Sequence, residues 1–318
     1  MTASVIALDV GGTMIKGALV GRGGAALHWQ RWPTQREGGP AAVVDRILSV
    51  ASELAEIART ELGAPSLAVG AAVPGAVEEG AGVARYSANL GWRDVPLRAL
   101  LSERLNLPTA VGHDVRAAGL AEGRWGAVKG SKDYLMVTLG TGIGGAVVAG
   151  GQLQVGAHAL GGEIGHVVVR RDGPVCGCGA RGCAEALASG SAIANHYRLA
   201  AGVGEEVSAE RVAARAAAGD PVAQVVWSQA LEALAEALAI YVTLLDPELI
   251  VMGGGLTAAG DSLLGPLREQ LATHLTFQAA PRIVQAELGS DAGCFGAALL
   301  AWEAWEGAAA VGERGATP

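Results

Sequence analysis

Residues 5–20 read VIALDVGGTMIKGALV, and the order of apolar residues and glycines in them indicates the fold class. Its first part, Val5 to Val10, is a short apolar run typical of a buried strand, and the Gly-Gly-Thr that follows predicts a tight loop into a second strand. Residues 135–148 read LMVTLGTGIGGAVV and repeat this layout of strand, glycine–threonine turn and strand. Internal similarity of this kind predicts two related α/β domains.

Apolar residues at helical spacing predict most of the remaining elements. The predicted helices cover residues 41–62, 97–105, 115–122, 191–199, 208–218, 221–245, 261–274 and 293–305. Further strands are predicted at 67–73 and 249–252, and the latter ends in three glycines, 253–255. Three glycine loops therefore each follow an apolar strand. Open α/β sheets bind ligands at such strand ends, and nucleotide phosphates are the natural occupant.

The composition limits the class of protein. A length of 318 residues is enough for two domains with cores of their own. The formal net charge of −8 argues against nucleic acid as the main partner, because phosphate binding needs a basic face. The most apolar stretch, residues 231–245, is interrupted by Glu232 and Glu236, so we expect no membrane span. The start, Met-Thr-Ala-Ser, lacks the pattern of a secretory signal, and we expect a cytoplasmic protein.

Residues 166–183 read HVVVRRDGPVCGCGARGC and contain three of the four cysteines of the chain. Three thiolates and an imidazole form a closed set suited to tetrahedral zinc. The candidate ligands are His166, Cys176, Cys178 and Cys183. Because Glu163 and Glu185 flank the cluster, a metal here would also fix the positions of two carboxylates.

Two other interpretations of the cysteines are weaker. A disulfide would leave one thiol over, and a Cys-x-Cys pair is awkward to bridge locally. Small core-filling cysteines do not fit a loop so rich in glycine. Cys294, which lies outside the cluster, is expected to be an ordinary buried thiol.

The first glycine loop is a candidate phosphate site. Gly11 and Gly12 leave backbone N–H groups open to an anion, Thr13 offers a hydroxyl, and Asp9 could orient a metal-bound water. Lys16 follows in the second strand. A Gly-Gly pair between two strands is also a routine hairpin turn, so the loop is weak evidence by itself.

Asp114 stands between the apolar stretch 109–113 and a helical segment. It could cap that helix through backbone N–H groups, or it could act as a general base at a strand end. Local sequence favours the cap.

Six segments of the chain form a joint pattern: 9–13 (DVGGT), 89–92 (NLGW), 139–145 (LGTGIGG), 162–166 (GEIGH), 176–185 (CGCGARGCAE) and 253–255 (GGG). Together they resemble the ROK family of repressors, open reading frames and kinases, in its bacterial glucokinase branch. The resemblance implies an α/β, actin-like (ribonuclease-H-like) fold of two domains around a central cleft. The expected domains are a small one, 1–112, completed by the helix 293–306, and a large one, 113–292, with the zinc-binding loop. Residues 307–318 are expected to form a flexible tail.

The resemblance also assigns roles. Asp114 is implied as the base that takes the proton from the sugar 6-hydroxyl. The implied sugar ligands are Asn89, Glu163, His166 and Glu185, and we expect Asp114 and His113 to belong to the same site. The implied nucleotide contacts are Gly11, Gly12, Thr13, Gly140, Thr141 and Gly254, to which the two glycine loops add Asp9, Lys16 and Gly142 as candidates. The implied zinc ligands are His166, Cys176, Cys178 and Cys183. The family commonly has Asn-Asp where this chain has His113-Asp114, which leaves the preferred sugar open: His113 either contacts the sugar or only fills the space of the asparagine.

The expected function is the ATP- and Mg²⁺-dependent phosphorylation of a hexose, foremost glucose to glucose 6-phosphate, by a homodimer or higher homo-oligomer with structural Zn²⁺. Alternatives are a kinase for another hexose or an N-acetylated hexosamine, a donor other than ATP such as polyphosphate, and a sugar sensor without catalysis. A sugar-responsive repressor is disfavoured, because the DVGGT segment begins at residue 9 and leaves no room for a preceding DNA-binding domain.

Overall fold

The structure is a computed structural model that describes residues 3–204 and 206–314, with side chains described up to residue 310. The chain divides into two compact units. Unit 1 contains the residues up to Trp125, Gly156–Leu160 and the segment from Asp291 onward, and unit 2 contains Gly126–Val155 and Gly161–Ser290.

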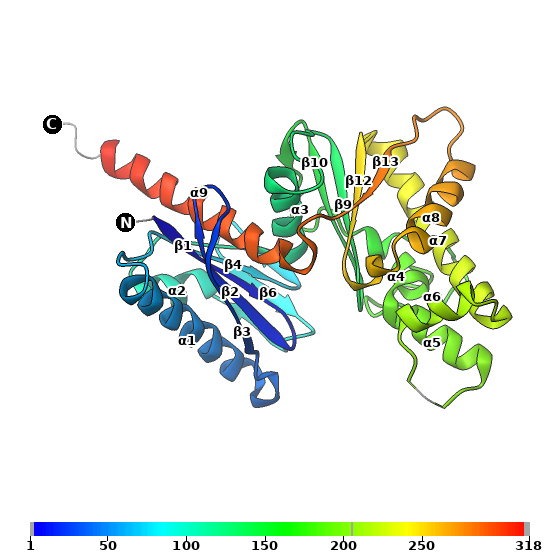
Figure 1. Ribbon diagram of the computed structural model, residues 1–318, viewed down its shortest axis with the longest axis horizontal. Coiled ribbons are helices and arrows are strands. Elements are labelled where there is room, and N and C mark those ends of the chain that lie inside the picture. The colour runs from blue at the N-terminus through cyan, green and yellow to red at the C-terminus, as the bar shows by residue number, and fades with distance from the viewer. Residues whose placement is uncertain (1–2, 205, 315–318) are drawn as a thin grey trace. The chain divides into compact units, whose positions relative to one another are not determined.

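Unit 1 is built on a five-stranded sheet with the order β3-β2-β1-β4-β8 (Figure 1). The first three strands are antiparallel, whereas β4 and β8 run parallel to β1. The strands are β1 (Ser4–Val10), β2 (Met14–Gly21), β3 (Ala26–Pro33), β4 (Val69–Val73) and β8 (Thr109–His113). A small antiparallel sheet adds β5 (Ala76–Glu78), β6 (Val83–Ser87) and β7 (Trp92–Val95).

Helices cover both faces of the larger sheet, and the alternation along β1 shows why. Ile6 and Leu8 belong to the core cluster that contains residues of α1 (Gly39–Thr60) and α2 (Leu97–Leu105). Val5 and Ala7 point the other way, into the cluster formed with α3 (Asp114–Trp125) and α9 (Ala292–Arg314). Figure 1 shows α1 and α9 on opposite sides of this sheet. A strand buried on both faces must be apolar throughout, as residues 5–8 are.

The predicted domain boundary, between residues 112 and 113, differs from the boundary between the two compact units. Helix α3 packs so closely on α9 that a Cβ on Gly296 would lie 2.2 Å from the carbonyl of Ala117. At Gly70 of β4, a Cβ would lie 1.8 Å from the Ala297 carbonyl oxygen. This glycine-mediated packing joins α3 to unit 1, so the division falls after Trp125.

The segment predicted as a flexible tail, from residue 307, is helical up to Arg314, because α9 continues to that residue. The segment 306–310 (EGAAA) carries three alanines, the strongest helix formers, which extend the helix past the expected end. Residues 315–318 of the predicted tail lie outside the described part of the chain.

Unit 2 contains a second five-stranded sheet, with the order β11-β10-β9-β12-β13. Its strands are β9 (Tyr134–Leu139), β10 (Ile143–Ala149), β11 (Gln152–Leu153), β12 (Leu249–Gly253) and β13 (Arg282–Gln285). Its helices are α4 (Ala184–Ala188), α5 (Gly190–Ala201), α6 (Ala209–Ala217), α7 (Pro221–Leu245) and α8 (Asp261–His274). One large cluster of buried apolar side chains joins these helices to the sheet.

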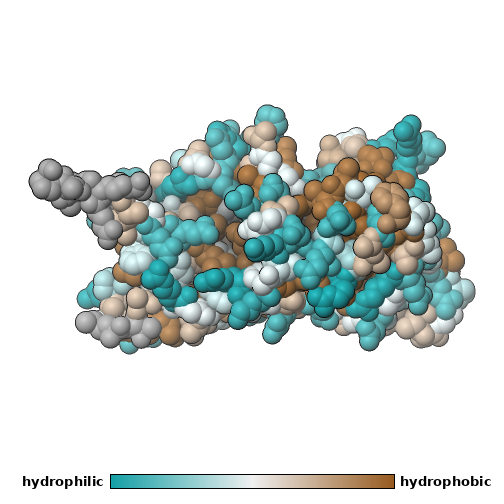
Figure 2. Space-filling view, turned by 90° about the horizontal axis from the view of Figure 1, so that it is seen from above, coloured by the Kyte–Doolittle hydropathy of each residue, from teal (hydrophilic) through white to brown (hydrophobic). Residues whose placement is uncertain are grey.

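Helix α7 is the one described helix that is long and apolar enough to cross a membrane, but 61% of its most apolar window is buried inside the protein. Its Trp227, Leu234 and Leu238 belong to the core of unit 2, which accounts for its apolar character. Figure 2 shows hydrophobic and hydrophilic residues mixed over one face of the molecule.

Most predicted helices and strands are present with small shifts at their ends. Asp220 caps the N-terminus of α7, since it accepts hydrogen bonds from Val222 N and Ala223 N. The predictions missed β3, the small sheet β5-β6-β7, β11, β13 and the short helix α4. The missed strands carry mixed polar and apolar residues, as in RIVQ of β13, and lack the continuous apolar pattern of central strands.

Candidate active site and metal centre

Asp114 lies where β8 of unit 1 ends and α3 begins. Its Oδ1 accepts a hydrogen bond from Val115 N at 2.7 Å and lies 3.4 Å from His113 Nδ1. Removal from water raises the pKa of Asp114, against the opposing effects of the Val115 N–H and the nearby Arg116. The side chain is still 31% exposed. The carboxyl group is therefore accessible and more basic than an ordinary aspartate.

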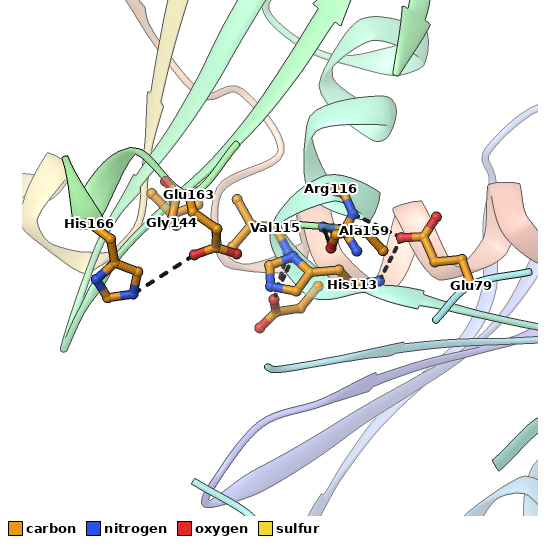
Figure 3. Close-up of polar contacts among 10 residues, drawn as sticks. Glu79, His113, Val115, Arg116, Gly144, Ala159, Glu163 and His166 are labelled. Atoms are coloured by element: carbon orange, nitrogen blue, oxygen red, sulfur yellow. Dashed lines mark hydrogen bonds and ion pairs between the residues drawn. The ribbon is translucent and has the colours of Figure 1, made fainter. Parts of the chain in front are cut away.

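An ion pair between a buried arginine and a partly exposed glutamate holds this strand–helix junction in place, and the sequence did not predict it. Arg116 is 1% exposed, and its Nε donates to Glu79 Oε1 at 2.9 Å. The same Oε1 accepts from His113 N at 3.3 Å, and Arg116 Nη1 donates to the Ala159 carbonyl at 3.0 Å (Figure 3). One feature of the sequence could have indicated this ion pair: a single arginine, Arg116, stands among apolar residues in the first turn of the helix, Asp-Val-Arg-Ala-Ala. Buried charges of this kind need a partner, which here comes from a turn 37 residues away.

Asp9 lies near the end of β1 in the same sheet, and its carboxyl group is partly buried. Its side chain is 16% exposed and pairs with Lys16 Nζ at 3.3 Å. Burial raises the pKa of Asp9 to about 6, although Lys16 acts in the opposite direction; Asp114 adds a smaller upward effect. Gly293, in the first turn of α9, lies against the Asp9 side chain, since a Cβ at this glycine would be 2.8 Å from the Asp9 carboxyl carbon.

The loop between β1 and β2 is shaped by two hydrogen bonds that involve Gly11. Its N–H donates to the Met14 carbonyl at 2.9 Å, and its carbonyl accepts from the Thr34 hydroxyl at 2.8 Å. Thr13 is exposed at the tip. Asn89 is also exposed, and its Cβ would be 3.8 Å from a Cβ on Gly12, so the structure brings this predicted sugar ligand beside the predicted phosphate loop.

In unit 2 the four predicted metal ligands are gathered at one point. One donor atom from each of His166, Cys176, Cys178 and Cys183 lies within 4.8 Å of all the others. A narrow hairpin makes this arrangement, with bridges between Val168 and Cys183 and between Val175 and Arg181. Gly182, at φ +73°, is needed because a Cβ there would be 1.4 Å from the Arg170 carbonyl oxygen.

The donor set fits zinc in its spacing. A tetrahedral ion with Zn–S bonds of about 2.3 Å places its sulfurs about 3.8 Å apart. Cys178 Sγ and Cys183 Sγ are 3.7 Å apart, and Cys176 Sγ is 3.6 Å from His166 Nδ1. Burial raises the pKa of Cys183 to about 12, so a cation is needed to hold this sulfur as a thiolate. Cys294 is a buried thiol outside the cluster, as predicted.

Glu163 and His166 stand on the segment that leads into this hairpin. His166 Nε2, the nitrogen remote from Cys176, lies 4.0 Å from Glu163 Oε2 (Figure 3). A metal held by Nδ1 would leave Nε2 as a directed N–H donor beside a carboxylate. Such a pair can donate to one sugar hydroxyl and accept from another.

The second glycine loop, 140–145, is packed against the segment that carries Glu163. A Cβ on Gly145 would lie 2.4 Å from the Gly162 carbonyl oxygen, and a Cβ on Gly165 would lie 2.3 Å from that of Ile143. These glycines therefore serve close backbone packing as well as any ligand. Thr141 is exposed at the tip, between the partly exposed Gly140 and Gly142.

The third glycine loop meets the same strand. Gly254, exposed and at φ +89°, lies so close to β9 that a Cβ would be 2.2 Å from the Leu139 carbonyl oxygen. Its own carbonyl accepts from the Thr257 hydroxyl at 2.7 Å. The predicted nucleotide contacts of unit 2 thus share the end of β9, since Gly140 follows Leu139 directly.

Comparison with known proteins agrees with this arrangement. The model of the ROK family matches residues 5–304. The chain belongs to the ROK family. Glucokinase of Thermotoga maritima is 35% identical over 312 residues, covering 93% of this chain and 96% of that protein. N-acetylmannosamine kinase of Shigella flexneri is 35% identical over 306 residues, covering 94% and 98%.

A solved structure extends the likeness to the fold. A ROK family glucokinase from Streptomyces griseus, solved in complex with glucose and AMPPNP, has a TM-score of 0.80 and is 30% identical in sequence. The match covers 95% of this chain and 100% of that chain. The predicted actin-like α/β fold of a ROK sugar kinase is thereby confirmed.

Proposed function

We propose that this ROK protein is an ATP-dependent hexose kinase that converts glucose to glucose 6-phosphate. The observation that carries the proposal is the environment of Asp114, a partly exposed carboxyl group with a raised pKa at the end of a buried strand. The likeness of nearly the whole chain to glucokinases supports the same activity.

In the proposed reaction, Asp114 accepts the proton of the sugar 6-hydroxyl as that oxygen bonds to the terminal phosphorus of ATP. The bond from this phosphorus to the oxygen it shares with ADP breaks, and ADP leaves. The raised pKa suits this task, because a stronger base takes the proton more readily. The Glu79–Arg116 pair holds the backbone of His113 and so keeps the base in position.

Sugar binding is assigned to Asn89, His113 and Asp114 of unit 1 and to Glu163, His166 and Glu185 of unit 2. Carboxylates and an amide at fixed positions discriminate between sugars because a wrong epimer leaves a buried polar group unpaired. His113 stands where the family commonly has asparagine, and we propose that it contacts the sugar and contributes to this choice.

Nucleotide binding is assigned to Asp9, Gly11, Gly12, Thr13 and Lys16 of unit 1 and to Gly140, Thr141, Gly142 and Gly254 of unit 2. Mg²⁺ bound with the nucleotide would neutralise phosphate charge. Asp9 is the acid suited to face that ion, and Lys16 is a cation for the phosphates. Zn²⁺ in the cysteine cluster would have a structural role. The thiolates need reducing conditions, which supports a cytoplasmic location.

The binding of the magnesium complex of AMPPNP should depend on pH through Asp9. Its pKa of about 6 means that the carboxylate becomes protonated as the pH falls through 6, so affinity should be retained at pH 8 and decline toward pH 5, about tenfold per unit below the pKa. Calorimetric titration without sugar measures this. Asp9→Asn should bind weakly at every pH, and its pH profile measures the part of the change that comes from titration of the ligand. If the affinity of this variant fell between pH 8 and pH 5 as steeply as that of the parent, the assignment to Asp9 would be contradicted.

The sugar and the donor are tested together. Glucose, mannose, fructose, N-acetylmannosamine and N-acetylglucosamine are each offered with ATP and with polyphosphate, and the phosphorylated sugar is measured. We expect the highest kcat/KM for glucose with ATP. Binding of hexose without turnover on any sugar would instead indicate a sensor.

An N-acetylhexosamine is the second candidate substrate, favoured by the likeness to N-acetylmannosamine kinase. It predicts that N-acetylmannosamine exceeds glucose in kcat/KM in the same panel.

A further inference from the structure

Glu185 joins the cysteine cluster to the second glycine loop. It is the second residue after the candidate ligand Cys183, within the short helix α4. Its Oε2 accepts a hydrogen bond from Ile143 N at 2.9 Å, and its Oε1 lies 3.8 Å from Cys176 Sγ. One carboxylate thus contacts a candidate metal ligand with one oxygen and the loop with the other.

The contact with the loop is close and specific. A Cβ on Gly142 would lie 2.6 Å from Glu185 Oε2, so the loop backbone rests directly on the carboxylate. A backbone N–H that donates to an ionised carboxylate forms one of the stronger hydrogen bonds of proteins. Because Ile143 is buried, its N–H would lack a partner if the carboxylate were removed.

A second contact holds the other end of the loop to the same part of the chain. Gly190 N, at the start of α5, donates to the Gly140 carbonyl at 2.8 Å, and a Cβ on Gly190 would lie 2.8 Å from that oxygen. Residues 185–190 therefore hold the loop from Gly140 to Ile143, and this segment directly follows the last cysteine of the cluster.

We infer that Glu185 is a positioning residue for nucleotide binding, through which the cysteine cluster sets the conformation of the loop 140–145. This inference rests on the proposed nucleotide role of that loop. It adds a second task to the sugar contact assigned to Glu185, and it predicts that disturbing the cluster weakens nucleotide binding even when no sugar is present.

Sugar-free binding of AMPPNP with Mg²⁺ separates the two tasks. We expect Glu185→Ala to raise the Kd about tenfold, which equals about 1.4 kcal/mol. Glu185→Gln keeps an oxygen that can accept from Ile143 N, so its Kd should stay within about threefold of the parent value while its KM for glucose rises. The matched control is Glu163→Ala, because Glu163 is a proposed sugar ligand from the same unit whose contact is with His166. This control should raise only the KM for glucose.

An unchanged sugar-free Kd in Glu185→Ala, with a raised KM for glucose as in Glu163→Ala, would overturn the inference. A parent-like Kd in Gly142→Ala would also count against the inference, because the added methyl group must displace the Glu185 carboxylate. Metal content is measured for each variant, and a change in Kd at full metal content assigns the effect to the Glu185 link. Failure of the proposed function would give a different result from failure of this inference. In that case the parent protein would phosphorylate no hexose, whether or not Glu185→Ala changed the Kd for AMPPNP.

Discussion

Asp114→Asn should lower kcat about 10³- to 10⁴-fold and leave the Kd for glucose within a few-fold of the parent value. The substitution keeps the size of the side chain and an oxygen that can accept from Val115 N, so the junction of β8 and α3 should keep its shape. The amide cannot take a proton from the sugar hydroxyl, and the variant therefore loses the proposed base while it retains a polar group for the sugar.

The measurement is a steady-state assay coupled to ADP release, together with calorimetric titration of glucose. Asp261→Asn is the matched control, because Asp261 also lies at the start of a helix but has a side chain that is 98% exposed. It should have the activity of the parent. Near-normal turnover by Asp114→Asn would assign the base to another residue.

The pH dependence of the parent supports the same test. A base must be deprotonated to act, and the raised pKa of Asp114 moves the acidic limit of activity to higher pH than an ordinary aspartate would allow.

Cys183→Ser should remove the metal and lower the melting temperature by on the order of 10 °C. Cys183 is fully buried, with 0% of its surface exposed, and its sulfur is one of the three that gather in the cluster with His166. Loss of the ion would leave His166, Cys176 and Cys178 without a common partner and release the hairpin, because structural zinc contributes directly to folding. The KM for glucose should rise as well, since Glu163 and His166 precede this hairpin.

Metal content by elemental analysis and melting by calorimetry measure these effects. Cys294→Ser is the control, because Cys294 is equally buried but lies outside the cluster, near the Ala7 carbonyl. It should retain one ion per chain. An unchanged melting temperature and undiminished metal content in Cys183→Ser would reject the metal site.

Two glycine packing contacts explain why the motifs of unit 2 occur together. The segment Gly-Gly-Glu-Ile-Gly-His and the loop 140–145 approach each other through Gly162 and Gly145, where a Cβ on either would lie within 2.5 Å of the other's carbonyl oxygen. A side chain at either position would separate the proposed sugar segment from the proposed nucleotide loop. We therefore interpret these glycines as a requirement of the site as a whole.

The sequence by itself determined the features that depend on neighbouring residues. The strand–glycine–strand pattern at 5–20 and 135–148, the ends of helices such as α7, and the spacing of the three cysteines are local properties. They could be recognised because periodicity, capping and ligand spacing are set by residues a few positions apart.

Only the tertiary structure decided which distant segments meet. Glu79 pairs with Arg116, Gly293 of the last helix lies against Asp9 of the first strand, and Glu185 receives the N–H of Ile143. Residues 156–160 join unit 1 although the residues on either side belong to unit 2. These contacts follow from packing whole sheets and helices around shared cores, and no local pattern records which partner a buried charge or a close-packed glycine will find.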